Sequence, residues 1–383
     1  MVGVNSVPWL VSVWPNSGKL AAGTLGGVVV LRRDLKEPWT AELAAEIAAR
    51  LDRGEVGILP TETVYGLCCS AAHAASVARV YALKQRPPSM ALPLVFGGAA
   101  QALAWTRTKS LVAHKLQREF WPGPLTLVLG QEPGQAIRVP RHGFTQAVLD
   151  IATGPIHATS VNVSGSAAGV REAELQREIV AATDFLVADD TSVGGTESTI
   201  VRVSEDGRAI VLRAGAISAK SVEECLRYRI VLLCTGNTCR SPMAEVLLRH
   251  MLCSAVGYRG QGDPPGFRIH SGGVAASGGQ PASENAIAVM AARGLDLGSH
   301  HSTPAAHLLG DADLVLCMTE EHLRFASGAD ELSPYAQVQL LDPNGLAVSD
   351  PFGGSLRDYE DCVDQLHQSL ASRIAPLQAR RPN

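Results

Sequence analysis

The chain has 383 residues and a formal net charge of −4, with 46% hydrophobic and 18% charged residues. This composition supplies enough apolar material for buried cores and excludes a globally disordered chain. The length predicts two to three domains, and the weak net charge excludes a strong overall basic field, so that any nucleic-acid contact has to be local.

The sequence shows no sign of membrane insertion or export. No apolar run reaches the roughly 18 residues that span a bilayer, and the first residues lack the basic and apolar segments of a signal peptide. The eight cysteines are scattered, and no pair of C-x2-C motifs indicates a zinc site. We therefore expect a cytoplasmic protein in a reducing compartment, with no membrane contact and no bound metal.

In chain order, residues 1–38 are expected to form an N-terminal arm with strand-like sequence near 28–31. Residues 40–53 predict a helix, because the segment is rich in alanine, is apolar on one face and carries Thr40 where it can cap the N-terminus. Alternating helix and strand patterns follow and predict an α/β domain over residues 39–225. Its strand-like runs are residues 125–129, 185–188, 199–203 and 210–212.

A second α/β domain is predicted over residues 229–383, because a new pattern of strand, turn and helix begins at Arg229. The segment RIVLLC is a short apolar strand, and TGNTCRSPMAEVLLRHML is a turn that enters a helix. This order is typical of an open, Rossmann-like domain with a parallel sheet. Further elements are expected as a helix over 283–293, a strand over 313–318 and an amphipathic helix over 356–374.

The sharpest motif of the chain is CTGNTCRS, which begins at Cys234 and has the spacing C-x5-R-S. Backbone N–H groups of a loop at a helix N-terminus bind a phosphate dianion, and the same field favours a thiolate. Arg240 can hold two phosphate oxygens, Ser241 can hydrogen-bond the sulfur, and Gly236 and Asn237 suit a positive φ. The motif predicts a nucleophilic thiolate in a phosphate cradle; the alternative is a structural cysteine at a strand end.

A thiolate nucleophile needs a general acid that protonates the departing group. Asp350, in the segment SDPFGGS, is the candidate, and Pro351 restricts the backbone that follows it. The dipeptide alone usually marks a turn, and Asp342–Pro343 is a second instance. The pattern by itself therefore does not choose between the two aspartates.

Residues 229–375 resemble the low-molecular-weight protein tyrosine phosphatase family in the segments VLLCTGNTCRSPMAE, SGG, DLVLCMTEEH and SDPFGGS. The resemblance implies that Cys234 attacks phosphorus, Arg240 binds phosphate and Asp350 is the acid. It also implies that a disulfide between Cys234 and Cys239 shields the nucleophile from over-oxidation, although Cys239 is equally well read as a small apolar loop residue. Arsenate reductases share the loop, but Arg324 stands where their relay needs a cysteine.

The segments CTGNTCRSPMAE and DPFGG resemble the protein-arginine phosphatase branch of that family. Tyrosine-specific members usually carry Ile or Leu in place of Thr238, whose hydroxyl suits a polar guanidinium or orients water. Asp350 can hold a phosphoguanidinium by charge, and Phe352 can stack on its plane. The expected substrate is phosphoarginine in a protein, with phosphotyrosine as the alternative. The expected substrate-binding residues are Asn237, Thr238, Ser241 and Phe352.

Polar residues of the first domain are informative only as a group. Lys84 and Arg86 stand two apart, so they can share one polyphosphate, and Ser160 and Asn162 alternate, so both can leave one face of a strand. Arg213 follows a strand. Taken singly, each is more typical of a solvated surface charge or a turn than of a binding site.

Residues 40–225 resemble the threonylcarbamoyl-adenylate synthase (YrdC-like) family in seven ordered segments. These are GILPTETVYGLCC, YALKQRP, FWPGPLTLVL, IRVPRH, ATSVNVSG, ESTIV and LRAGAIS. The resemblance implies a twisted α/β sheet with a large positive cavity. It also implies the synthesis of threonylcarbamoyl-AMP and pyrophosphate from L-threonine, bicarbonate and ATP with Mg²⁺, for the threonylcarbamoyladenosine modification of tRNA. Implied partners are other tRNA-modification proteins and RNA, including double-stranded RNA.

The resemblance also assigns residues. Those implied to bind ATP are Lys84, Arg86, Ser160, Asn162 and Arg213, and those implied to bind threonine are Thr61, Tyr65, Thr126 and Ser198. Two positions depart from the family pattern, because Met90 stands where a lysine or asparagine is usual and Phe96 where a histidine is usual. These departures leave open an alternative, in which the domain binds nucleotide or RNA without catalysing synthesis.

Overall fold

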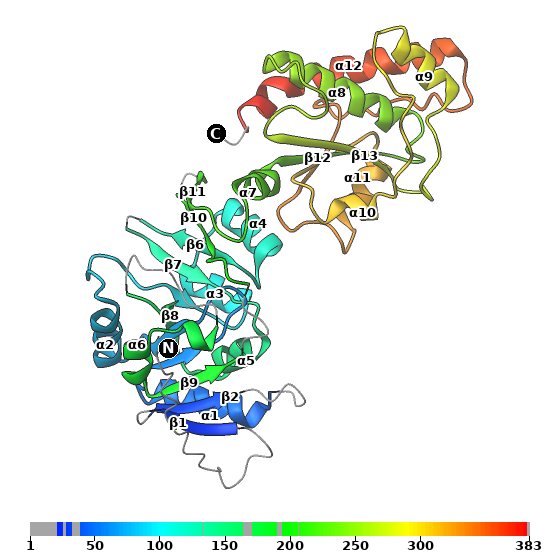
Figure 1. Cartoon of the computed structure of the whole chain (residues 1–383). Helices are drawn as coiled ribbons and strands as arrows, with labels where there is room; N and C mark the ends of the chain where they lie inside the picture. The colour runs from blue at the N-terminus through cyan, green and yellow to red at the C-terminus, as the bar shows by residue number, and fades with distance from the viewer. Residues whose placement is uncertain are drawn as a thin grey trace, which may run out of the picture. The chain divides into compact units, whose positions relative to one another are not determined.

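The computed structural model describes residues 21–25, 28–32, 39–131, 133–163, 171–189, 194–205 and 207–380. The chain divides into two compact units, Met1–Cys225 and Leu226–Asn383 (Figure 1). Each unit has its own sheet and its own buried core. The α/β class expected for both halves is confirmed.

The first unit is built on a mixed sheet, 11-stranded in the described residues, with the order β1-β2-β9-β3-β4-β8-β5-β7-β6-β10-β11. The pairs β2–β9, β3–β9, β5–β7 and β6–β10 are parallel, and the other neighbours are antiparallel. The strands are β1 (Ala21–Leu25), β2 (Val28–Arg32), β3 (Gly57–Leu59), β4 (Gly66–Ser70), β5 (Leu94–Val95), β6 (Leu125–Leu129), β7 (Gln135–Arg138), β8 (Ile156–Ser160), β9 (Phe185–Ala188), β10 (Thr199–Val203) and β11 (Ala209–Arg213).

Helices cover both faces of this sheet. In β9, Phe185 and Val187 face a core that includes Ile47, whereas Leu186 faces a second core that includes Val80. This alternation follows from the two-residue period of a strand. The helices are α1 (Ala41–Asp52), α2 (Ala74–Lys84), α3 (Ala99–Thr106), α4 (Leu111–Phe120), α5 (Gly143–Ile151), α6 (Arg177–Ala181) and α7 (Ala219–Leu226), with a 3₁₀ turn at Glu172–Glu174.

The four strand-like runs of this unit are confirmed as β6, β9, β10 and β11, and the capped helix is confirmed as α1. The hydroxyl of Thr40 accepts a hydrogen bond from the N–H of Leu43 at 3.2 Å. The strand expected near 28–31 is confirmed as β2, but it does not belong to a separate arm, because β2 pairs in parallel with β9 and carries β1 into the sheet. Residues 1–20 of that arm lie outside the described residues.

The second unit has a parallel sheet of four strands in the order β13-β12-β14-β15. The strands are β12 (Tyr228–Cys234), β13 (Phe267–Gly273), β14 (Leu314–Cys317) and β15 (Gln337–Leu340). The helices are α8 (Arg240–Ala255), α9 (Glu284–Ala291), α10 (Ala306–Leu309), α11 (Glu320–Ser327) and α12 (Leu356–Gln378). The expected helices and strand are confirmed, and the last helix runs four residues further than expected, to Gln378.

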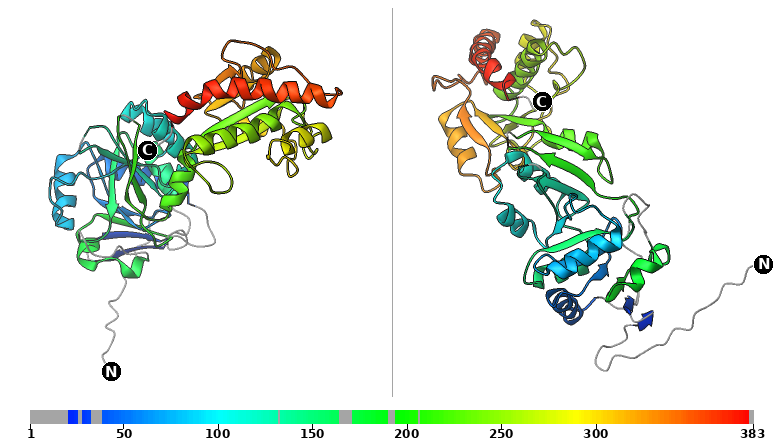
Figure 2. Two further views of the ribbon diagram at one scale, coloured as in Figure 1. Left: turned by 90° about the horizontal axis from the view of Figure 1, so that it is seen from above. Right: turned by 90° about the vertical axis from the view of Figure 1, so that its left-hand side faces the viewer.

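Alternate residues of β12 serve two cores. Ile230, Leu232 and Cys234 face the core formed with α8, α9 and α12, whereas Val231 and Leu233 face the core formed with α10 and α11. Figure 2 shows α12 running alongside α8 on the first of these faces. The apolar strand therefore delivers Cys234 to the carboxyl end of the sheet, at the N-terminus of α8.

Gly57 allows a close approach between β3 and the ring of Phe185. A Cβ atom at residue 57 would lie 2.1–2.4 Å from ring carbons of Phe185, which is fully buried. We expect Gly57→Ala to lower the free energy of unfolding of the first unit by about 1–3 kcal/mol, because the packed core cannot move aside freely. All five tryptophans precede residue 226, so tryptophan fluorescence during urea unfolding reports on this unit.

Gly143→Ala is the matched control, because a Cβ atom there meets nothing within 4 Å and the residue begins a helix. We expect it to leave stability unchanged or to raise it slightly. Equal unfolding midpoints for the two variants would contradict the packing argument.

Two candidate functional sites

Cys234 lies at the end of β12, and its side chain is 2% exposed. Its Sγ atom is 3.0 Å from the hydroxyl of Ser241 and accepts a hydrogen bond from the N–H of Asn237 at 3.2 Å. The 16-residue helix α8 begins at Arg240, so the positive end of its dipole lies at the same loop. These donors suit a sulfur that carries negative charge, as a thiolate nucleophile does.

The buried side chain of Asn237 stabilises the conformation of the loop through hydrogen bonds. Its Nδ2 group donates to the hydroxyls of Ser241 and Ser271 at 2.9 Å each, and its Oδ1 atom accepts from the N–H of Thr303 at 2.7 Å. The expected positive φ is confirmed at Asn237, with a value of 56°, but is wrong for Gly236. Both Asn237 and Ser241 are 0% exposed. Their side chains therefore support the loop, and the expected hydrogen-bond distance between Ser241 and the sulfur is found, whereas a contact of either side chain with substrate stays a prediction.

Arg240 and Asp350 meet across 110 residues of sequence. One Nη atom of Arg240 lies 2.5 Å from Oδ2 of Asp350 and 3.2 Å from the hydroxyl of Thr235. The arginine is 5% exposed, whereas the side chain of the aspartate is 47% exposed. The competing Asp342 instead accepts hydrogen bonds from the N–H of Asn344 and the hydroxyl of Ser369. The structure thus brings Asp350 to the cysteine loop and uses Asp342 in a turn.

Thr238 and Phe352 occupy different environments beside this loop. Thr238 is half-buried, and its carbonyl accepts a hydrogen bond from the N–H of Ser283 at 2.9 Å. Phe352 is 76% exposed, and its N–H donates to Oδ1 of Asp350 at 3.2 Å. The aromatic ring therefore stands free in solvent next to the candidate acid.

His322 is a member of this site that sequence reasoning missed. Its Nε2 atom is 3.0 Å from the hydroxyl of Thr235, and its Nδ1 atom is 2.9 Å from that of Thr319. Burial, with the positive charge of Arg240, lowers the pKa of His322, which favours the neutral form of the ring. The only signal was its position as the last letter of DLVLCMTEEH.

Cys239 does not form a disulfide in this structure and contacts two hydroxyl groups instead. Its Sγ atom lies 3.4 Å from the hydroxyls of both Ser283 and Tyr359. All eight cysteines are free in the structure, so the implied bond between Cys234 and Cys239 is not formed in it. Burial raises the pKa of Cys317 to about 12, which keeps that thiol unreactive.

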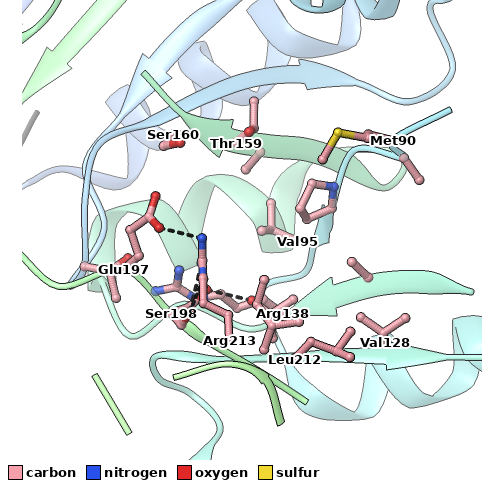
Figure 3. A pocket seen from close by; sticks show the side chains of 18 of the residues that line it. Met90, Val95, Val128, Arg138, Thr159, Ser160, Glu197, Ser198, Leu212 and Arg213 are labelled. Atoms are coloured by element: carbon pink, nitrogen blue, oxygen red, sulfur yellow. Dashed lines mark hydrogen bonds and ion pairs between the residues drawn. The ribbon is translucent and has the colours of Figure 1, made fainter. Parts of the chain in front are cut away.

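The first unit contains a pocket of about 470 Å³ between β4, β6, β8, β10 and β11 (Figure 3). Seven of the nine residues expected from sequence line it: Thr61, Tyr65, Arg86, Thr126, Ser160, Ser198 and Arg213. The hydroxyls of Thr126 and Ser198 lie 2.9 Å apart, and the hydroxyl of Tyr65 accepts from the N–H of Asp189. The structure therefore gathers residues that are up to 152 positions apart in the sequence (61 to 213).

Lys84 and Asn162 lie behind the wall of the pocket. The ammonium group of Lys84 donates to the carbonyls of Ser160 and Asn162, at 2.5 and 2.8 Å, and to Oδ1 of Asn162 at 2.9 Å. A lysine has three N–H donors, so none is left for a phosphate. Burial lowers the pKa of Lys84 to about 8, helped by the charge of Arg86 and opposed by that of Glu197. In this structure Lys84 therefore supports the wall of the pocket, and its direct contact with ATP stays a prediction.

The side chains that line the pocket carry more positive than negative charge. Four arginines line it, Arg86, Arg138, Arg202 and Arg213, and among the described lining residues Glu197 is the one acid. One Nη atom of Arg138 lies 2.7 Å from Oε1 of Glu62. Sequence reasoning missed Arg138, although this arginine is part of the segment IRVPRH. Such a lining favours an anionic ligand such as a polyphosphate.

The two residues that depart from the family pattern, Met90 and Phe96, lie in different environments. Met90 lines the pocket and is 50% exposed, so an apolar thioether occupies part of its mouth. Phe96 is 3% exposed and packs against Trp105 at a ring-centroid distance of 6.2 Å. The second departure therefore belongs to the core and leaves the pocket lining unchanged.

Within the described residues, no group of three or more His, Cys, Asp or Glu side chains is arranged to hold a metal ion. In the same part of the chain, no helix combines the length and apolar character needed to cross a membrane.

Comparison with known families agrees with the two-part architecture. Residues 49–215 match the Sua5–YciO–YrdC family model, described as telomere recombination. Residues 229–383 match the model of low molecular weight phosphotyrosine protein phosphatases. Threonylcarbamoyl-AMP synthase of Rattus norvegicus is 30% identical over 219 residues, which cover 52% of this chain and 76% of that protein. The chain belongs to both families. It is therefore a fusion of a synthase-family unit with a phosphatase-family unit.

Solved structures from both families are similar to this chain. The YwlE arginine phosphatase from Geobacillus stearothermophilus is 31% identical to this chain. The match covers 40% of this chain and 94% of the phosphatase chain, with a TM-score of 0.33. The Sua5 protein of P. abyssi, complexed with L-threonine, is 18% identical to this chain. The match covers 63% of this chain and 83% of the Sua5 chain, with a TM-score of 0.47.

Gly273 lets β13 approach the cysteine loop. A Cβ atom there would lie 2.7 Å from the carbonyl oxygen of Thr235 and 2.9 Å from the amide nitrogen of Asn237. We expect Gly273→Ala to lower kcat/KM for an aryl phosphate by roughly 100-fold, because a shift of about 1 Å misplaces the nucleophile. Gly310→Ala is the control, since its nearest contact is an ordinary 3.4 Å. Equal activity of the two variants, both folded by circular dichroism, would refute this role of Gly273.

Proposed function

We propose that this protein is a bifunctional enzyme. Its first domain, residues 39–225 with the β1–β2 hairpin, makes L-threonylcarbamoyl-AMP for tRNA modification. Its second domain, residues 229–383, hydrolyses phosphoarginine in proteins through a cysteinyl-phosphate intermediate. The contact of Arg240 with Asp350 beside Cys234 carries the second assignment, and the pocket with four arginines and paired hydroxyls carries the first.

The phosphatase reaction follows from the loop geometry. The Sγ atom of Cys234 attacks phosphorus while the backbone N–H groups and Arg240 bind the non-bridging oxygens. Binding of the phosphate to Arg240 releases Asp350, which in its protonated form gives its proton to the leaving nitrogen. Water then attacks the cysteinyl phosphate, with Asp350 as the base, and Cys234 leaves as a thiolate next to the hydroxyl of Ser241.

Phosphoarginine fits the mouth of this site for reasons of charge and shape. The leaving guanidinium is planar and cationic, and it would meet the carboxylate of Asp350, which is 47% exposed on its side chain. The ring of Phe352 offers a face for stacking, since it is exposed and tied to Asp350 through its backbone. Phosphotyrosine is the alternative, because an exposed phenyl ring also packs against another phenyl ring.

Thr238→Ile tests the substrate class. A branched apolar side chain favours an aryl group and removes a hydroxyl that suits a guanidinium, so we expect the ratio of phosphoarginine to aryl-phosphate activity to fall about tenfold or more. The measurement is kcat/KM on a phosphoarginine peptide and on the matching phosphotyrosine peptide. Cys234→Ser is the inactive control for both. An unchanged ratio would contradict the specificity argument, and activity on phosphotyrosine alone would favour the alternative substrate.

The synthase reaction uses the positive pocket. Carbamate oxygen of N-carboxythreonine attacks the α-phosphorus of ATP and pyrophosphate leaves, while the arginines stabilise the charge that develops on the phosphates. The pocket offers a single carboxylate, so Mg²⁺ would arrive on the ATP phosphates and neutralise their charge there. Lys84 acts as a positioning residue, because its ammonium group holds the end of β8, where Ser160 faces the pocket.

Two further points extend this proposal. The eight free cysteines are in keeping with a reducing cytoplasm. Transfer of the product to tRNA needs partner proteins of the modification machinery and a contact with RNA.

Pyrophosphate release separates the synthase from a binding module. We expect release to depend on both L-threonine and bicarbonate, to persist in Cys234→Ser and to fall roughly 100-fold in Arg86→Ala, because a cation at the phosphates is lost. ATP binding without pyrophosphate release in the wild type would establish the binding module instead.

A further inference from the structure

Glu197 is the exception in the charge pattern of the first unit's pocket. Four arginines line this pocket, and Glu197 is the single acid among its described lining residues. Figure 3 shows its side chain extending into the pocket toward the guanidinium of Arg213. In a pocket that holds only phosphates and a carboxylate of the ligand, the negative charge of Glu197 would repel these groups and weaken their binding. Its presence calls for a cationic group on the ligand.

The backbone of Glu197 is rigidly placed. Its carbonyl accepts a hydrogen bond from the N–H of Ala216 at 3.0 Å, and a Cβ atom at Gly215 would lie 2.2 Å from the same oxygen. The strand β10 begins two residues later, at Thr199. The carboxylate therefore projects from an ordered segment, and its position is set by the fold.

The contacts of Glu197 leave part of its carboxylate available. Its Oε2 atom lies 2.5 Å from an Nη atom of Arg213, and the two side chains are 38% and 41% exposed. No hydrogen bond or ion pair within the described residues involves the other oxygen, Oε1. One carboxylate oxygen thus remains open to a ligand.

Arg213 does not need Glu197 in order to keep its place. Its Nε and Nη2 atoms both donate to the carbonyl oxygen of Ser198, at 3.2 and 2.9 Å. The backbone therefore orients the guanidinium on its own. A role for Glu197 as a mere anchor of Arg213 is redundant, which points to a role toward the ligand.

The neighbours of Glu197 define which ligand group it would meet. Ser198 follows it in sequence, and the hydroxyls of Ser198 and Thr126 are 2.9 Å apart in the pocket wall. A carboxylate beside two hydroxyls and several arginines complements an ammonium group, a hydroxyl and a carboxylate. These are the three polar groups of L-threonine.

We propose that Glu197 binds the α-ammonium group of the amino-acid substrate and accepts the proton that this group must lose before it reacts. The inference rests on the synthase function proposed above and deepens it. In the first step the ammonium N–H bond breaks, the proton passes to the carboxylate, and a neutral amine and a carboxylic acid result. The nitrogen lone pair then attacks the carbon of bicarbonate, and water leaves, so that an N-carboxylate forms. The partly exposed carboxyl returns its proton to solvent.

The test compares Glu197→Gln with Glu205→Gln in the full chain. Glu205 is exposed on the same β10–β11 hairpin and does not line the pocket, so it is a matched control. Titration calorimetry measures the affinity for L-threonine, for ATP and for 2,3-dihydroxybutanoate, which carries a hydroxyl in place of the ammonium group. We expect wild type and Glu205→Gln to prefer L-threonine over this analogue about 10- to 100-fold, because the charge-assisted hydrogen bond is lost with the analogue.

In Glu197→Gln that preference should disappear, while the affinity for ATP stays within about twofold of wild type. The pH dependence supplies a second readout. Without the carboxylate, the reactive amine must form by deprotonation in solution, so pyrophosphate release by the variant should rise about tenfold per pH unit below the pKa of the amine and level off above it. The wild-type rate should rise less steeply below that pKa.

Two results would overturn the inference. One is an undiminished preference for L-threonine in Glu197→Gln, and the other is an equal loss of affinity for ATP and L-threonine, which would mean that the residue acts only through Arg213. Failure of the synthase function looks different. In that case wild type would bind L-threonine in a Glu197-dependent manner but release no pyrophosphate, and the amino-group site would stand.

Discussion

Asn237 makes the interaction on which the second unit depends. Its amide side chain is completely buried and satisfied by two serine hydroxyls and a backbone N–H, and its own N–H points at the sulfur of Cys234. A buried amide that lost these partners would be destabilised by about 1–3 kcal/mol per unsatisfied group. The network therefore confines the loop to one shape, with φ of 56° at Asn237, and that shape directs the hydrogen-bond donors of the loop toward the nucleophile.

The first unit uses a buried lysine in the same way. Lys84 has every N–H donor bound to oxygen atoms at the end of β8, in a site where burial lowers its pKa to about 8. A charged group is stable there only while those oxygens remain in place. Lys84 thus fixes the strand end that presents Ser160 to the pocket, and the arginines that face the ligand are a separate set.

Both candidate sites separate supporting groups from reacting groups. The supports are buried and fully hydrogen-bonded, as Asn237 and Lys84 are. The groups that would meet a substrate are paired with one another, as in the contacts of Arg240 with Asp350 and of Arg213 with Glu197, and in each pair the carboxylate is partly exposed. The two partners of such a pair neutralise each other's charge. When an anionic substrate binds the arginine, the ion pair breaks and the carboxylate becomes available for proton transfer.

The sequence by itself determined the two α/β units, their families and the cysteine loop. It did so because strand periodicity, capping by Thr40 and the loop from Cys234 to Ser241 are local features, written in contiguous residues. The resemblance of the segment SDPFGGS had already favoured Asp350 over Asp342, and the tertiary structure showed the contact of Asp350 with Arg240. Only the tertiary structure decided that β1 and β2 extend the sheet and that Lys84 turns inward. It also revealed His322, Arg138 and Glu197 as members of the sites. Each of these depends on contacts between segments far apart in the chain, such as the 110 residues between Arg240 and Asp350, and the periodicity of a local segment carries no record of them.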